Sequence, residues 1–318
     1  MSAGRYAFVR RRLVQLPFLV LGITIITFLL LRLIPGNPAL VILGNHYTAA
    51  GARQVNDALG LNKPLLAQYG QFMSRLFHGN LGYSFFYAEG ARTVIGQHIY
   101  PTLFVILYAA VLAACIAIPI GVISGMRRNG WFDQGARVFF TVAFAMPSFW
   151  LGLILVLVFS VHIDVFPIDG YGKGFGGHLY YLFLPALTLA LPYSTVLVRS
   201  LRASVISVSR ADFVDTARIK GIPTWRVLTH HIVRNAIVTV VSVFGVNLAY
   251  LVGGTVLIEN VFSLPGLGSL LVSSVSTRDY PVVQGVTLVF ALGIVLVNLI
   301  TDVVHAMLDP RAATGSGD

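Results

Sequence analysis

The chain has 318 residues, of which 56% are hydrophobic and only 11% are charged, whereas roughly a quarter of the residues in soluble proteins are charged. Together with a mean hydropathy of +0.81, this excludes an ordinary soluble protein and indicates that lipid covers much of the surface. A net charge of +10 could suggest nucleic-acid binding, but the basic residues stand at the ends of apolar runs, so no nucleic-acid partner is expected. The single cysteine, Cys115, supports neither an internal disulfide nor a metal cluster.

Six apolar stretches are long enough to cross a membrane, since a helical span needs about 20 residues. They run approximately over residues 13–35, 100–125, 138–162, 179–198, 236–258 and 282–307. We predict helices, because backbone groups in lipid must be hydrogen-bonded within their own segment. Pro119, Pro147, Pro185 and Pro192 are expected to kink these spans without ending them.

The basic residues are distributed unevenly between the connecting segments. With a cytoplasmic N-terminus, the inside segments hold 15 of the 22 Lys and Arg residues, and the two short outside loops hold only Lys173 and Arg278. This bias predicts that both termini are cytoplasmic. The basic start resembles a signal peptide, but the apolar run that follows is long and lacks a cleavage site, so we expect a retained first span.

Two connecting segments are too long for simple turns. Residues 37–99 form an external segment with recurring apolar and aromatic residues, including LGLNKPLLAQY and GNLGYSF, and we expect a small folded cap with short helices there. Residues 199–235 form an inside segment rich in charge.

The inside segment reads ADFVDTARIKGIPTWRVLTHHIVRNAI from Ala211 to Ile237, which predicts two short helices around a glycine. Acidic residues begin the first helix and basic residues end it, as the helix dipole favours. Gly221 stands where a left-handed C-terminal residue is needed, and Pro223 suits the start of a second helix over residues 224–234. Arg226, His230 and Arg234, spaced by four, predict a polar face on that second helix.

The same segment resembles the cytoplasmic loop of ABC-importer permeases, whose pattern is EAA, three residues and then Gly. Here Asp215-Thr216-Ala217 precede Gly221 by that spacing, and the HxxRNA element is similar to the peptide/nickel branch. The general family pattern has Ile-x-Leu-Pro after the glycine, and this chain departs from it. The resemblance implies a helix that couples the permease to an ATPase subunit, through Asp215, Thr216, Ala217, Arg218, Lys220, Gly221, Pro223, His231, Arg234 and Asn235.

Other segments resemble the same family over nearly the whole chain. Leu33 to Pro38 is similar to its RxxPGDP element, Glu259 to Gly268 to its ExxFxxPGxG element, and residues 308–311 to its terminal DPR. The long external segment favours the B-type subunit over its C-type partner. The resemblance implies an external gate or loop formed by Glu259, Phe262, Pro265, Gly266 and Gly268. Whether Glu259 caps backbone amides or contacts substrate stays open.

The resemblance implies an all-α integral membrane protein with six transmembrane helices and the type I ABC importer permease fold. Its domains would be residues 1–94 (first helix plus external loop), 95–307 (permease core) and 308–318 (cytoplasmic tail). It would form the pathway for di- or oligopeptides in the bacterial cytoplasmic membrane. Its partners would be a C-type permease, two ABC ATPase subunits and an extracytoplasmic binding protein or lipoprotein.

Phosphate chemistry is expected in other chains, because this sequence has no GxxxxGK[ST] motif. No catalytic residue, metal site or cofactor is expected here; ATP and Mg²⁺ would be bound by the partner ATPases. Permeases for nickel or glutathione remain alternatives to a peptide permease. A secondary transporter or channel is a further alternative, although it predicts mid-span charges and an inverted repeat, and neither is found in the sequence.

Overall fold

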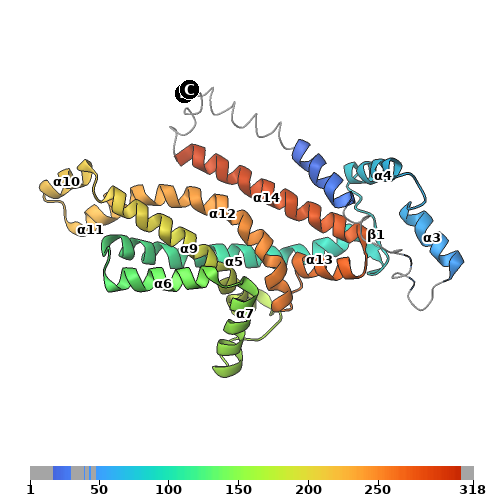
Figure 1. Ribbon diagram of the computed structural model, residues 1–318, viewed down its shortest axis with the longest axis horizontal. Coiled ribbons are helices and arrows are strands. Elements are labelled where there is room, and N and C mark those ends of the chain that lie inside the picture. Colours follow the sequence, from blue (N-terminus) through green and yellow to red (C-terminus); the bar gives the residue numbers. More distant parts are fainter. Residues whose placement is uncertain (1–16, 30–38, 40–42, 44–47, 309–318) are drawn as a thin grey trace. The chain divides into compact units, whose positions relative to one another are not determined.

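The computed structural model describes residues 17–29, 39, 43 and 48–308, which are mostly helical (Figure 1). They group into two compact units. Unit 1 holds Leu103–Leu264 and the described residues from Leu296 onward, and unit 2 holds the described residues of Leu13–Thr102 together with Pro265–Val295. Two long helices, α5 (Ala91–Met126) and α14 (Tyr280–Leu308), each contribute residues to both units.

Unit 2 begins with an apolar helix, Pro17–Leu29. It also contains α3 (Ala49–Leu59), α4 (Leu65–Phe77), the strands β1 (Tyr83–Ser84) and β2 (Glu89–Gly90), and α13 (Leu267–Ser276). The two strands pair antiparallel. The first helix contacts α4, where the Thr24 hydroxyl lies 3.0 Å from the Tyr69 hydroxyl and the Phe28 ring lies 5.2 Å from the Tyr69 ring. Short helices are therefore present between residues 37 and 99, but α5 begins well before the span expected at 100–125.

A buried carboxylate ties the strand pair to the turn before α14. The hydroxyl of Ser84 donates a hydrogen bond to Asp279, and both side chains are buried. Burial raises the pKa of Asp279, and the hydrogen bonds from Ser84 and the Val282 amide oppose part of that rise. The surrounding core combines the start of α5 with α13 and α14, through Ala91, Val94, Ile95, Leu267, Leu270, Val282 and Val286.

Unit 1 is organised around one central helix, α9 (Phe183–Val208). The other elements of unit 1 are α6 (Trp131–Ala145), α7 (Ser148–Val156), the π-helix η2 (Leu157–His162), α8 (Gly174–Tyr181), α10 (Asp212–Ile219), α11 (Thr224–Arg226), the π-helix η3 (Val227–Val233) and α12 (Arg234–Val261). The helices α6, α7 and α12 pack against α9. Its apolar stretch is 72% buried, against 28–35% for the other candidate spans.

Glycines let α5 approach α9 closely. A Cβ atom on Gly125 would lie 2.6 Å from Val205 Cγ1, and one on Gly121 would lie 2.9 Å from Leu201 Cβ. Small residues at a contact of this kind allow two membrane helices to pack backbone against side chain. The α5–α9 contact therefore depends on the absence of side chains at these two positions.

Four described helices are long and apolar enough to cross a membrane: Ala91–Met126, Phe183–Val208, Val243–Val261 and Tyr280–Thr301. The number is five if α6 and the following helix count as one broken span. Of the first expected span, 13–35, only the short helix Pro17–Leu29 lies within the described residues. The structure thus shows a mostly helical membrane protein with four or five candidate spans where the sequence predicts six.

The span expected over residues 138–162 is not one continuous helix. Helices Trp131–Ala145 and Ser148–His162 meet at an angle of 108°. Met146 has an extended conformation, with ψ 135°, and Pro147 precedes the first residue of α7, as expected where a proline disfavours the helical conformation of the preceding residue. Pro119 and Pro192, in contrast, lie within unbroken helices, as predicted.

Candidate functional site

The first helix of the inside segment is α10, and it packs through one narrow face. Val214 and Ala217 are buried, while Phe213 and Ile219 are exposed, Ile219 to 86%. The helix carries its acidic residues in the first turn and Arg218 in the last, which is the arrangement that the helix dipole favours. An exposed ion pair joins Asp215 to Arg218 at 3.2 Å. The two helix ends predicted from charge are therefore confirmed.

Gly221 ends α10 in a Schellman motif. Its φ is +73°, its amide donates to the Arg218 carbonyl at 2.9 Å, and the Ile222 amide donates to the Ala217 carbonyl at 3.2 Å. These are the two hydrogen bonds that define the motif. A Cβ atom at this position would meet no atom within 4 Å. Backbone conformation, not space, is therefore what requires glycine here.

The second helix of the segment starts as predicted but does not end at Arg234. Pro223 directly precedes α11, and the chain passes through the π-helix η3 into α12 without a break. The wide π turn is accompanied by side-chain bonds to the backbone: Thr229 donates to the Trp225 carbonyl at 2.9 Å and Asn235 to the His231 carbonyl at 2.6 Å. The separate short helix expected over residues 224–234 is thus the first part of a long one.

The predicted polar face of this second helix is present. Arg226, His230 and Arg234 are all exposed, and Val227 and Ile232 are buried on the other side. The guanidinium of Arg226 lies 5.3 Å from the centre of the Trp225 ring, within the range of a cation–π contact. Of the remaining residues of this element, Asn235 is exposed and His231 is half-buried.

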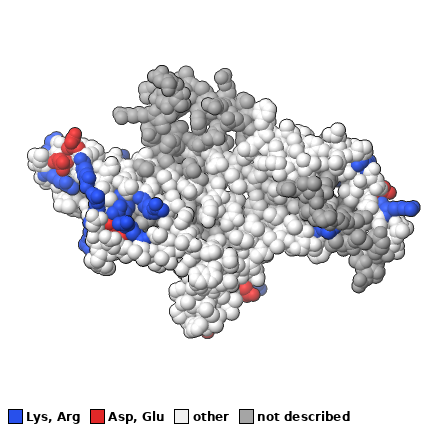
Figure 2. Space-filling model, viewed as in Figure 1, with Lys and Arg blue, Asp and Glu red and all other residues white. Residues whose placement is uncertain are grey.

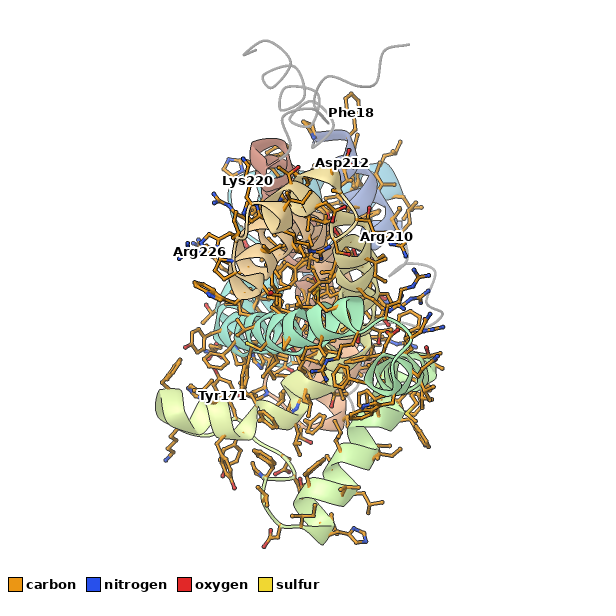
Figure 3. All side chains as sticks on the ribbon, turned by 90° about the vertical axis from the view of Figure 1, so that its left-hand side faces the viewer. Phe18, Tyr171, Arg210, Asp212, Lys220 and Arg226 are labelled. Carbon is orange, nitrogen blue, oxygen red and sulfur yellow. The ribbon has the colours of Figure 1, made fainter. Side chains whose placement is uncertain are left out.

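We call the exposed residues of 212–226 the α10–α11 surface. Figure 2 shows Lys and Arg side chains gathered over this end of unit 1. In Figure 3, which looks onto the same end, Lys220 and Arg226 extend from one side of the segment and Arg210 lies on the other. The charged residues predicted for coupling, Asp215, Arg218 and Lys220, are exposed on it together with Thr216, Gly221 and Pro223.

Three exposed apolar side chains lie on this surface, Phe213, Ile219 and Trp225, with Ile219 and Trp225 the most exposed of the three. The exposure of Phe213 and Ile219 was not predicted from the sequence. The signal that could have found them is the pattern of α10. Its buried positions, Val214 and Ala217, already supply an inward face by their spacing of three. Apolar residues at the other positions then have no partner within the segment.

The second predicted group lies at the far end of α12 and is partly buried. Glu259 and Phe262 in unit 1 are fully buried, and the Leu264 amide donates to the Glu259 carbonyl at 2.8 Å. In unit 2, Pro265 is exposed, while Gly266 and Gly268 are buried at the start of α13. There the Leu267 amide donates to the Thr102 hydroxyl at 2.7 Å. Glu259 and Phe262 are thus packed within unit 1, and Gly266 and Gly268 within unit 2.

Comparison with known proteins places the chain among transport-system membrane components. The family described as binding-protein-dependent transport system inner membrane component matches residues 117–314, and the N-terminal family of such membrane components matches residues 5–97. The chain belongs to this family. It is therefore a multi-pass inner-membrane permease component of a transport system, not itself an enzyme, that works with a binding protein and an ATPase.

Curated relatives match this permease over nearly their whole length. A putative peptide transport system permease protein of Brucella suis biovar 1 is 38% identical over 312 residues, covering 96% of this chain and 98% of that protein. The oligopeptide transport system permease protein AppB of Bacillus subtilis is 35% identical, covering 95% and 98%. The glutathione transport system permease protein GsiC of Pectobacterium atrosepticum is also 35% identical, covering 95% and 97%.

A buried ion pair anchors the end of α9 that leads into the α10–α11 surface of this permease. The guanidinium of Arg202 donates two hydrogen bonds to the Asp133 carboxylate, at 2.6 and 2.7 Å, and the Asn129 amide donates a third at 2.9 Å. Asp133 has no solvent exposure, and the Arg202 side chain is 20% exposed. This two-pronged pair fixes the start of α6 against α9.

Proposed function

We propose that this permease forms half of the translocation pathway of an ATP-driven importer and that the α10–α11 surface couples it to an ATPase subunit. A second, C-type permease forms the other half, two ABC ATPase subunits bind from the cytoplasm, and an extracytoplasmic binding protein or lipoprotein delivers the substrate. ATP and Mg²⁺ are held by the ATPase subunits. Nucleotide then biases a two-state change in access to the pathway.

The observation that carries this proposal is the exposed apolar group on a charged cytoplasmic segment. Phe213, Ile219 and Trp225 are 46%, 86% and 59% exposed, and large exposed apolar side chains beside a polar rim mark protein-binding surfaces. The fixed C-terminus of α10 at Gly221 holds them in a defined arrangement. A helix with a rigid end and an exposed apolar face is suited to insertion in a groove of a partner.

We further propose six transmembrane helices with both termini in the cytoplasm, completed by a first span over residues 13–35. The bent pair α6 and α7–η2 then counts as one broken span. The ranges 1–94, 95–307 and 308–318 serve as the first helix with its external loop, the permease core and the cytoplasmic tail. The loop at Glu259, Phe262, Pro265, Gly266 and Gly268 is the external gate.

The substrate we propose is a di- or oligopeptide. The Brucella and Bacillus relatives are named as permeases for peptides and oligopeptides, and an Escherichia coli K12 relative, 32% identical over 337 residues, as a probable D,D-dipeptide permease. Glutathione is the second candidate, because one relative of similar identity is named for it. Uptake measured with both kinds of substrate in the reconstituted complex separates the two.

Two substitutions test the coupling role. Asp215→Lys reverses an exposed charge on α10, and Gly221→Pro forbids the observed φ and removes the amide that donates to Arg218. Both variants should insert in the membrane but lose co-purifying ATPase and substrate uptake. Asp169→Lys, at an exposed loop position of the same unit, is the matched control and should behave as wild type. Normal uptake by Asp215→Lys and Gly221→Pro would refute the coupling role.

A further inference from the structure

An arginine-lined cavity lies beside the inner ends of α6 and α9 in unit 1. Its volume is about 590 Å³, and the residues that line it are Arg128, Asn129, Arg137, Arg199, Arg202, Ala203, Ile206 and Arg210. The volume falls within the roughly 300–1,000 Å³ of typical ligand sites. Among the described lining residues there is no Asp or Glu. We call this feature the arginine basin.

The basin is a product of helix geometry and not only of a basic segment. Arg199, Arg202, Ala203 and Ile206 are spaced by three and four along α9, so they share one face of that helix. Arg137 reaches the same space from α6. Arginines that only set topology need to be on the cytoplasmic side. They do not need to converge on a concavity.

The charge in the basin is largely uncompensated. Asp133 pairs with Arg202 through Nε and one Nη atom of that side chain. Arg128, Arg137, Arg199 and Arg210 are exposed, and within the described residues they form no ion pair of their own. Planar guanidinium groups bind phosphate oxygens in pairs of parallel hydrogen bonds. The basin therefore has the chemistry of a phosphate-group site.

A second, smaller cavity opens from the same residues and contains an unsatisfied donor. Its volume is about 260 Å³, and it shares Arg137, Arg199 and Arg202 with the basin. Ser124 lines it; this residue is 1% exposed, and its hydroxyl has no hydrogen-bond partner in the described structure. Buried hydroxyls are normally satisfied. An oxygen-rich ligand reaching this cavity would supply the acceptor.

The setting of the basin favours an amphipathic ligand. Trp131, Val138 and Phe139 on α6 are large exposed apolar side chains, and Val138 and Phe139 directly follow Arg137 in that helix. A phospholipid whose phosphate group lies in the basin would have its acyl chains free to cover these side chains. Basic pockets at the cytoplasmic ends of membrane helices bind anionic lipid head groups in this way.

We propose that the arginine basin binds a phosphate group and that its source is an anionic phospholipid of the inner leaflet, held between α6 and α9. This goes beyond the coupling role of the α10–α11 surface and does not depend on it. The site fixes a lipid next to the Asp133–Arg202 pair that anchors the end of α9.

Native mass spectrometry of the delipidated transporter complex tests the proposal, with phosphatidylglycerol, phosphatidylcholine and inorganic phosphate added separately. Wild type should retain phosphatidylglycerol in preference to phosphatidylcholine. Each arginine near an anionic lipid surface contributes about 1 kcal/mol, which is roughly fivefold in affinity. Arg137→Gln/Arg199→Gln should therefore bind phosphatidylglycerol more weakly by about twentyfold or more. Competition by inorganic phosphate at comparable concentration would support the phosphate site and assign it to a soluble ligand.

The matched control is Arg53→Gln/Arg127→Gln, which removes the same charge at exposed positions outside both cavities. It should keep wild-type lipid retention. Equal retention in the two double variants would overturn the proposal, and so would equal binding of the two phospholipids. Loss of co-purifying ATPase from Arg137→Gln/Arg199→Gln with unchanged lipid binding would also overturn it, and would reassign the basin to a protein interface.

Discussion

The buried pair between Asp133 and Arg202 offers the sharpest test of how α9 is held. We predict that Arg202→Ala destabilises the protein more than Asp133→Ala. The first change leaves a carboxylate with no solvent exposure that keeps only the Asn129 amide as a hydrogen-bond donor among the described residues. The second leaves a guanidinium that is 20% exposed and faces the arginine basin. In the native structure water reaches the guanidinium but not the carboxylate.

The magnitude follows from that difference in exposure. Removing one partner of a buried pair costs about 3–5 kcal/mol, and we expect Arg202→Ala to fall in that range. Partial hydration should reduce the cost of Asp133→Ala to about 2–3 kcal/mol. Because the double variant strands neither charge, its cost should be smaller than the sum of the two, with a coupling of about 2 kcal/mol.

The assay is a double-mutant cycle by thermal or detergent unfolding of the purified permease. The control is Asp215→Ala, which breaks an exposed pair with Arg218 and should cost about 0.5 kcal/mol or less. If Asp133→Ala lowers the free energy of unfolding no more than this control does, or if the effects of Asp133→Ala and Arg202→Ala are additive, the pair does not anchor α9.

Three further predictions concern single positions. Gly125→Val should destabilise by about 1–3 kcal/mol because its Cβ would lie 2.6 Å from Val205 Cγ1; Gly135→Ala, whose Cβ meets no atom within 4 Å, should not destabilise in the same melts. At Gly221, Asn should preserve more co-purifying ATPase than Val, because Asn tolerates φ near +73°; equal loss would contradict a backbone cause. Burial raises the pKa of Asp279, so the folded state binds its proton more tightly than the unfolded chain. Stability should therefore fall as pH rises from the ordinary aspartate value through the raised one, and Asp279→Asn should remove that part of the pH dependence of the melts.

The structure of α10 could be predicted most fully from the sequence. The acidic first turn, the basic last turn, Gly221 and Pro223 each act within a few residues, so their structure could be predicted without knowing what surrounds them. The family motif added the expected role of the same residues. Exposure of Phe213 and Ile219 could not be predicted as easily, because it depends on which face of α10 finds a partner.

The break between α6 and α7 at Pro147 could not be predicted from local rules alone. Pro119 and Pro192 also lie in apolar stretches, yet α5 and α9 continue through them, so proline alone does not decide. The helix α9 continues through Pro192, and Pro192 is buried. Its burial depends on how α9 packs against other helices, which the local sequence does not give. The arginine basin was missed for the same reason, since Arg199 is far in sequence from Arg128 and Arg137 and meets them only after α6 has packed on α9.

The continuous helix from α11 through η3 into α12 joins two segments that the sequence predicts as separate helices, residues 224–234 and 236–258. One helical rod begins at Thr224, beside the exposed Trp225, and ends at Val261, two residues after the buried Glu259. At 1.5 Å per residue, its 38 residues correspond to a length of about 57 Å along the helix. A continuous helix links a displacement at one end to the other end. The π-helical turns of η3 are the one stretch of it whose hydrogen bonds are not those of an α-helix. A stroke applied at Trp225 is therefore either delivered to Glu259 or taken up as a change of winding in the seven residues of η3.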